Sequence, residues 1–188
     1  CFASAPFQSE CNSSYCFTPE QLQWSLSGDC LIEFLPNISH FVGSDILAGI
    51  ISSGMFESSR YSLLLDLGTN GELVLGNNEK MWCTSTAAGP AFEGVNISCG
   101  MRASSGAISE VEYRNGKFQV YTIDDVKPVG LCGSGLVEAI YSLLENEMID
   151  CMGTVTDENI NSFELAEGVT LTVNDIREFQ LAKAAIAA

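Results

Sequence analysis

Residues 61–76, with the sequence YSLLLDLGTNGELVLG, constrain the fold more than any other segment of the chain. Two short apolar runs, LLL and LVL, flank a polar turn, which predicts a β-hairpin because Asn-Gly favours tight turns between strands. The turn consists of Gly68, Thr69, Asn70 and Gly71. Its glycines leave backbone N–H groups open to phosphate oxygens, and the carboxylate of Asp66, just before the turn, can hold Mg²⁺ directly or through water. A plain hairpin that binds nothing is the alternative interpretation.

The composition excludes several classes of function. The 188 residues are 46% hydrophobic, so the chain can bury a core as one domain, or as one domain and part of another. No apolar stretch reaches the ~20 residues of a membrane span, so we expect no membrane partner. The net charge of −16 and the lack of a basic stripe argue against nucleic-acid binding. A single histidine, His40, leaves little for a Ser-His-Asp triad.

Eight cysteines raise the question of a metal or disulfide framework. They are Cys1, Cys11, Cys16, Cys30, Cys83, Cys99, Cys132 and Cys151. No pair has C-x₂-C spacing, so we expect structural, reduced thiols and a cytoplasmic location. The chain begins at Cys1 and stops inside the helical run LAKAAIAA, which favours a fragment of a longer protein.

The rest of the chain alternates between helical and extended patterns. We expect a helix over 41–56, strands over 61–67, 71–76 and 80–84, a hairpin of 107–114 and 118–123 that turns at Asn115-Gly116, a helix over 134–147, a strand over 169–172 and a helix from Asn174. The first 30 residues show only weak periodicity. Antiparallel strands followed by strand–helix alternation predict an α/β fold, a ribonuclease-H-like half with an N-terminal hairpin sheet and packed helices. The first hairpin's turn then points at the ligand crevice.

Two further loops could carry chemistry. Residues 130–135, GLCGSG, precede a helix, so free N–H groups and the helix dipole suit a phosphate there. Residues 85–94, STAAGPAFEG, have small side chains that allow another molecule to approach closely, and Glu93 is their only charge. For both loops the alternative is purely structural, namely a tight strand-to-helix turn and a packed supporting loop.

Five motifs, DLGTNGE, STAAGPAFEG, GMRASSGAI, GLCGSGL and DIREFQLAKAAI, occur in this order. They resemble the C-terminal ATPase domain of the reductive activators of corrinoid proteins, members of the superfamily of actin, sugar kinases and heat-shock chaperones. The resemblance runs from Leu35 to the end, so residues 35–188 are expected to form the second ribonuclease-H-like half of an actin-like ATPase domain, truncated at its C-terminus. Residues 1–34 match less clearly and stay unassigned.

The resemblance implies that ATP with Mg²⁺ drives reduction of an inactive Co(II) corrinoid on a partner protein to Co(I). It assigns Asp66 to catalysis and to Mg²⁺, bound directly or through water. The implied phosphate-binding residues are Gly68, Thr69, Asn70, Gly71, Gly133, Ser134 and Gly135. Ser85, Thr86 and Glu93 are the candidate contacts to the corrinoid partner. An iron–sulfur cluster is expected in a separate domain outside this chain. Whether the protein forms a homodimer is left open.

Some superfamily elements are missing from the sequence. It has no Asp-x-Gly-Thr-Thr turn for the first phosphate hairpin and no Gly-Gly adenosine loop. We therefore expect the fragment alone to bind ATP with a dissociation constant no better than about millimolar, roughly −4 kcal/mol. Two alternatives are a sugar or acid kinase half, with Glu93 or Asp45 as base, and a non-catalytic interaction module.

Overall fold

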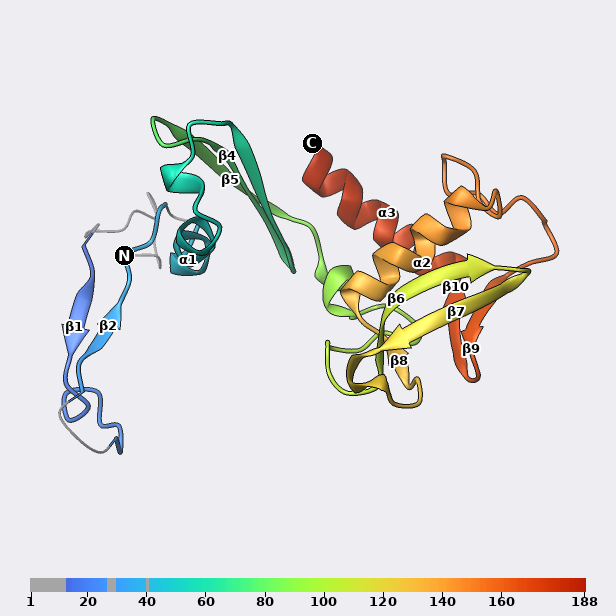
Figure 1. Cartoon of the computed structure of the whole chain (residues 1–188), viewed down its shortest axis with the longest axis horizontal. Helices are drawn as coiled ribbons and strands as arrows, with labels where there is room; N and C mark the ends of the chain where they lie inside the picture. Colours follow the sequence, from blue (N-terminus) through green and yellow to red (C-terminus); the bar gives the residue numbers. More distant parts are fainter. Residues whose placement is uncertain (1–12, 27–29, 40) are drawn as a thin grey trace. The chain divides into compact units, whose positions relative to one another are not determined.

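The computed structural model describes residues 13–26, 30–39 and 41–188 (Figure 1). His40, Cys1 and Cys11 lie outside the described residues. The chain folds into two compact units, of which the first comprises Cys1–Asp66 with Glu72–Ser85 and the second Leu67–Gly71 with Thr86–Ala188. We describe each unit separately.

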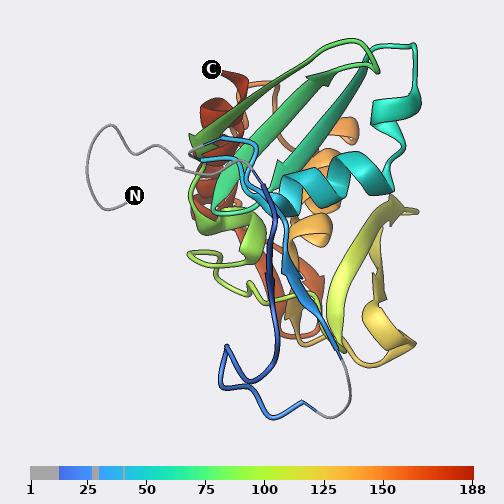
Figure 2. The same ribbon diagram turned by 90° about the vertical axis from the view of Figure 1, so that its left-hand side faces the viewer.

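The first unit is built on the predicted hairpin. Strands β3 (Ser62–Leu67), β4 (Asn70–Gly76) and β5 (Met81–Ala87) form a sheet in the order β3-β4-β5. Helix α1 (Ser44–Ser52) packs beside it (Figure 2). The core between helix and sheet consists of Val42, Ile46, Ile50, Met55 and Val74, with Leu64, Met81 and Cys83 packed against it. The apolar face of the amphipathic helix and the inward-facing residues of the strands thus pack together in one small core.

Two sequence predictions for this unit need correction. The Asn-Gly pair does not form the turn, because β4 already begins at Asn70 and only Gly68 and Thr69 connect the strands. The predicted helix over 41–56 is divided, since Gly54 adopts φ 68° and separates α1 from the 3₁₀ turn η1 (Met55–Glu57). In strand β3, Leu63 and Leu65 are 55% and 45% exposed.

A short antiparallel pair in the N-terminal segment was not predicted. Strand β1 (Tyr15–Phe17) pairs with β2 (Ile32–Phe34). Phe34 makes edge-to-face contacts with Phe17 and Trp24, which hold the pair together. Strands of three residues contain too few alternations to give a period-2 signal.

The second unit contains the predicted second hairpin. Strands β6 (Ala107–Arg114) and β7 (Lys117–Thr122) are antiparallel, and β8 (Gly130–Leu131) adds in parallel to β6 to give the order β7-β6-β8. The turn is the predicted one: Asn115 and Gly116 have φ 53° and 80°, the left-handed values of a type I′ turn. Helix α2 (Gly133–Glu145) packs on β6 through Leu136, Ala139, Ile140 and Leu143, which are all buried.

A third hairpin and helix complete this unit. Strands β9 (Ser162–Ala166) and β10 (Val169–Thr172) are antiparallel, and α3 (Val173–Ala187) follows directly. The short 3₁₀ turns η2 (Pro90–Glu93) and η3 (Ile123–Asp125) lie in the connections. The prediction included β10 and α3 but missed β9 and the two-residue β8. The core joins α2, α3 and both hairpins, and includes Ile108, Leu131, Leu171 and Ile176.

Helix α3 begins with a buried polar cluster. Thr172 and Asp175 form a capping box, in which the backbone N–H of Asp175 donates to the Thr172 hydroxyl oxygen at 3.2 Å. The carboxylate of Asp175 has 0% exposure and also accepts from the backbone N–H and the hydroxyl of Ser98, at 2.7 and 3.0 Å. Asp175 therefore fastens the start of α3 to the loop before β6.

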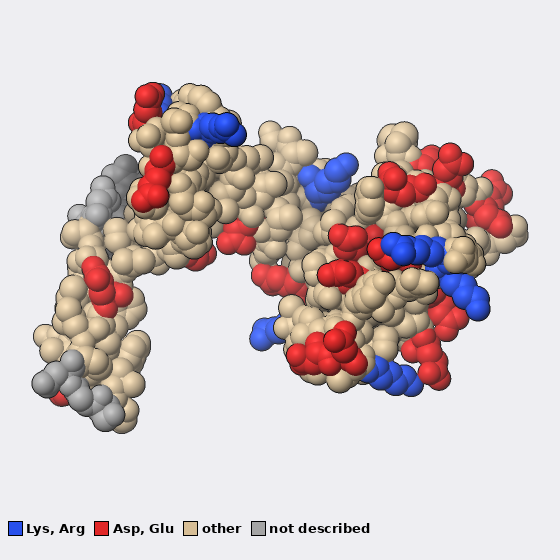
Figure 3. All heavy atoms as spheres, in the orientation of Figure 1, with Lys and Arg blue, Asp and Glu red and all other residues tan. Residues whose placement is uncertain are grey.

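The surface is acidic and the cysteines are unpaired where the structure describes them. Acidic side chains are spread over the visible face, with few Lys and Arg among them (Figure 3). The free cysteines are Cys16, Cys30, Cys83, Cys99, Cys132 and Cys151. Within residues 13–26, 30–39 and 41–188, no group of His, Cys, Asp and Glu is arranged to hold a metal ion. None of the helices in that part of the chain has the length and hydropathy to cross a membrane.

Candidate functional site

The turn between β3 and β4 holds a carboxylate from another part of the chain. The backbone N–H of Thr69 donates to Glu93 Oε1 at 3.1 Å, and the Thr69 hydroxyl donates to Glu93 Oε2 at 2.8 Å. Both bonds lower the pKa of the Glu93 carboxyl from its ordinary value, and the bond from the hydroxyl has the larger effect. The tip of the hairpin therefore presents an N–H and an O–H that together bind an anionic group.

The segment η2 brings Glu93 to this position. Gly89, at φ 83°, turns the chain into η2, and its N–H donates to the carbonyl oxygen of Thr69 at 2.9 Å. On the other side, a Cβ on Gly133 would collide with the carbonyl oxygen of Phe92. Only glycine permits this approach. The 3₁₀ turn thus contacts both the hairpin tip and the start of α2.

A pocket of about 480 Å³ lies beside η2, lined by Phe92, Glu93, Met101, Arg102, Ala103, Cys132, Gly133 and Ser134. It unites the predicted Glu93 with the predicted Gly133 and Ser134. Arg102 was not predicted as a site residue, although the motif GMRASSGAI contains it as its single cation. Its positive charge also contributes, as a smaller cause, to the lowered pKa of Glu93.

The pocket includes the N-terminus of α2. Cys132 is the N-cap residue, and no side chain caps this helix within the described chain. The first N–H groups of a helix lack intrahelical partners, and here the bond from Leu136 N–H to Cys132 O, at 2.8 Å, is where the ladder begins. The last glycine of this loop, Gly135, is also needed for packing: it is buried, and a Cβ there would collide with the carbonyl oxygen of Ile108. Gly135 lets α2 pack on β6.

The remaining predicted phosphate and metal residues lie along the hairpin. Asp66, near the end of β3, is exposed, and an exposed carboxylate suits Mg²⁺, which keeps much of its water shell. Asn70 is exposed as well. Gly71 is buried, and a Cβ there would meet Ile186 at 2.8 Å. Its lack of a side chain therefore serves packing against α3.

The candidate partner contacts Ser85 and Thr86 lie within β5, and their predicted place just after the third strand is wrong. The strand runs to Ala87 because pairing with β4 continues beyond the apolar run. The Ser85 hydroxyl donates to Glu72 Oε1 at 2.9 Å. The Thr86 hydroxyl donates to the carbonyl oxygen of Ala185 at 3.1 Å, so it ties the end of β5 to the last turn of α3.

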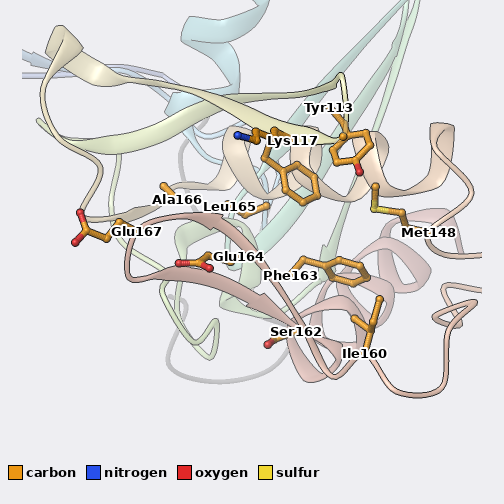
Figure 4. Close-up of a pocket in the computed structure, with 12 residues that line it drawn as sticks. Tyr113, Lys117, Met148, Ile160, Ser162, Phe163, Glu164, Leu165, Ala166 and Glu167 are labelled. Carbon is orange, nitrogen blue, oxygen red and sulfur yellow. The ribbon is translucent and has the colours of Figure 1, made fainter.

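A further candidate residue lies in the first unit, and a further hollow lies in the second. Asp45, considered as a kinase base, is in the first turn of α1 in the first unit. A larger hollow of about 640 Å³ lies between the β6–β7 turn and β9 (Figure 4). Apolar side chains such as Tyr113, Met148 and Phe163 line it, and none of the candidate site residues predicted from the sequence is among its lining residues.

Comparisons with known proteins identify the family. Residues 60–188 match the family model described as the C-terminal domain of RACo, the ASKHA domain, and residues 2–58 match that of the RACo middle region. The chain belongs to the RACo family. Its ASKHA region has the actin-like ATPase fold, so the fold class expected from the sequence is confirmed.

Individual relatives agree with this assignment. The chain is 34% identical over 207 residues to the corrinoid activation enzyme RamQ of Eubacterium limosum, covering 97% of this chain and 35% of that protein. It is 31% identical over 182 residues to the [Co(II) methylated amine-specific corrinoid protein] reductase of Methanosarcina barkeri, covering 85% and 33%. A solved structure of a reductive activator for corrinoid, iron-sulfur protein has a TM-score of 0.84 at 30% identity, over 98% of this chain and 33% of that one. The chain spans about a third of the length of these relatives.

The chemistry of the site in this RACo chain is that of anion binding. The hairpin tip offers two donors from Thr69, the start of α2 offers backbone N–H groups, and Arg102 lines the pocket beside them. A helix N-terminus and oriented N–H groups both favour negative charge. On a chain whose net charge is −16, this local arrangement is what would allow a phosphate group to bind.

Proposed function

We propose that this chain is the phosphate-binding half of an ATP-dependent activator that reduces an inactive Co(II) corrinoid on a partner protein to Co(I). The observation that carries the proposal is the carboxylate bound by the N–H and the hydroxyl of Thr69 at the hairpin tip. A turn that binds one anion through two directed donors is suited to bind another. The similarity to a corrinoid activation enzyme and to a Co(II) corrinoid protein reductase supports the choice of reaction.

In this proposal the chain's own residues bind and orient the nucleotide phosphates. Gly68, Thr69, Asn70 and Gly71 supply the hairpin tip, and Gly133, Ser134 and Gly135 the helix start. Asp66 holds Mg²⁺, directly or through water, and the metal would neutralise phosphate charge and orient the oxygens. Arg102, which lines the same pocket as Ser134, adds a cation at the phosphates. The domain boundary expected between residues 34 and 35, where the ATPase half would begin, stays a prediction.

The corrinoid is the substrate, bound by a partner protein. Ser85 is the proposed contact to it, with Thr86 and Glu93 as further partner contacts. Donation of the Ser85 hydrogen to Glu72 Oε1 leaves the hydroxyl oxygen's lone pairs free and increases their electron density. Reduction of Co(II) to Co(I) takes one electron, which we expect from an iron–sulfur cluster in a domain outside this chain.

The test uses the full-length protein with its Co(II) corrinoid partner. Asp66→Asn is expected to abolish Mg-ATP hydrolysis while leaving the fold intact, because the carboxylate is exposed and contributes nothing to the core. Asp124→Asn removes the same charge from an exposed position in η3 and should hydrolyse ATP normally. Ser85→Ala should retain basal hydrolysis and lose corrinoid reduction.

Four results would contradict the proposal. Normal ATP hydrolysis by folded Asp66→Asn removes the phosphate and metal assignment. Equal loss of hydrolysis and reduction in Ser85→Ala returns this residue to a supporting role in β5. Phosphoryl transfer to a small molecule in place of corrinoid reduction would indicate a kinase. A full-length protein that does not hydrolyse ATP would indicate an interaction module.

A further inference from the structure

The Glu93 carboxylate occupies the hairpin tip in the manner of a phosphate. Its two oxygens accept from two donors of one residue, the N–H of Thr69 at 3.1 Å and its hydroxyl at 2.8 Å. Gly68 leaves room for this approach, since a Cβ there would lie 3.2 Å from Glu93 Oε1. A phosphate group presents its oxygens to N–H and O–H donors in the same way. The donors assigned to a phosphate in the proposed function are therefore already in use.

A carboxylate and a phosphate cannot both occupy this position. The backbone N–H and the hydroxyl of Thr69 each have one hydrogen to donate, and Glu93 accepts both. The two anions would also repel each other at contact distance. For a phosphate to reach these donors, the Glu93 side chain has to leave them.

The Glu93 side chain is free to leave the hairpin tip, and a cation lines the pocket beside it. Its side chain is exposed, so no core packing holds it against Thr69. Arg102 lines the same pocket and interacts electrostatically with the Glu93 carboxylate. Gly94, the next residue, is packed closely on Met101, where a Cβ would lie 2.6 Å from the backbone nitrogen. The backbone is thus fixed just after Glu93, and a rotation of its side chain is sufficient to vacate the hairpin tip.

We propose that Glu93 is a built-in competitor of the nucleotide's phosphate, which occupies the donors of Thr69 in the nucleotide-free protein and swings away when a phosphate binds. This inference rests on the proposed function for the identity of the ligand. Its consequence is regulatory: the segment 85–94, which carries the proposed partner contacts, changes its bonding at the moment that phosphate arrives. The fraction of molecules with a vacant tip then limits the apparent affinity for nucleotide, because Kd rises in inverse proportion to that fraction.

The test measures nucleotide affinity in the full-length protein by titration calorimetry with Mg-ADP and with a non-hydrolysable Mg-ATP analogue. Glu93→Gln keeps the side chain's shape but removes its charge and one acceptor, and Glu93→Ala removes the whole head group. Both are expected to bind the nucleotides about tenfold more tightly if the wild-type tip is vacant in roughly a tenth of molecules. Adenosine, which has no phosphate, should bind all variants equally. Glu158→Gln, the same charge change at an exposed position, should match wild type for every ligand.

The outcomes separate this inference from the proposed function. Tighter binding of the phosphate-bearing ligands alone supports the competitor role. Unchanged or weaker binding in both variants, with a wild type that does bind nucleotide, overturns the inference and makes Glu93 a brace of the hairpin tip. No nucleotide binding by the wild type or by either variant overturns the proposed function, and the inference with it. A parallel gain for adenosine would also overturn it, since the effect would then not concern phosphate.

Discussion

Asp175 is the residue whose removal should most clearly reveal how the second unit is held together. It has 0% exposure, and its oxygens accept four hydrogen bonds: Oδ1 from the N–H and hydroxyl of Ser98, and Oδ2 from the N–H and hydroxyl of Thr172. The two hydroxyls lie 3.3 Å apart and can rotate to other acceptors. The two backbone N–H groups, each 2.7 Å from the carboxylate, cannot. Asp175→Ala therefore leaves two part-buried donors without an acceptor.

The expected cost follows from those two donors. A buried donor without a partner costs about 1–3 kcal/mol, so we expect the local stability of the α3 start and its loop to fall by about 3 kcal/mol. Because about 1.4 kcal/mol is a factor of ten, amide hydrogens in both segments should exchange about a hundredfold faster. Asp175→Asn retains one acceptor oxygen but turns an NH₂ group toward the other donors, so a smaller acceleration in the same direction is expected.

Hydrogen exchange followed by mass spectrometry on the full-length protein makes the measurement, with peptides that cover 95–101 and 172–178. Asn174→Ala is the matched control, because Asn174 is exposed in the same turn of α3. It should change exchange only slightly. If Ser98 and Thr172 exchange no faster in Asp175→Ala than in this control, the carboxylate does not hold the two segments together and the reasoning is refuted.

Two further predictions concern pH and close packing. The folded-state pKa of Glu93 is lowered from 4.5, so its contact with Thr69 stabilises the fold above pH 4.5 and this stabilisation is lost as the pH falls through the lowered pKa. A ¹³C titration of the Glu93 carboxyl measures this pKa. A midpoint above 4.5 would contradict the assigned hydrogen bonds. Gly135→Ala should destabilise the protein by about 2–3 kcal/mol, since its Cβ would collide with a carbonyl oxygen of β6. At Gly116 a Cβ would meet open space, and only the backbone φ of 80° opposes it, so Gly116→Ala should cost only about 1 kcal/mol. Denaturant unfolding measures both variants, and equal losses of stability would contradict the packing argument.

The parts of this fold that the sequence determined by itself depend on short-range patterns. The Asn115-Gly116 turn follows from two residues that both accept positive φ, and helix α2 from an apolar stripe of period 3.6. The hairpin of β3 and β4 follows from two apolar runs separated by a polar turn. In each case the residues that decide the structure are neighbours along the chain, so local chemistry was sufficient.

The tertiary structure alone decided which residues meet at the candidate site. Thr69 and Glu93 are 24 positions apart and Ser98 and Asp175 are 77 apart, and no periodicity links such pairs. The sequence placed Glu93 among partner contacts, whereas in the fold it is bound to the phosphate-type hairpin turn. The reason is physical: a side chain's bonding partner is set by which backbones the packed core brings within about 3 Å, and that depends on packing distributed over the whole unit.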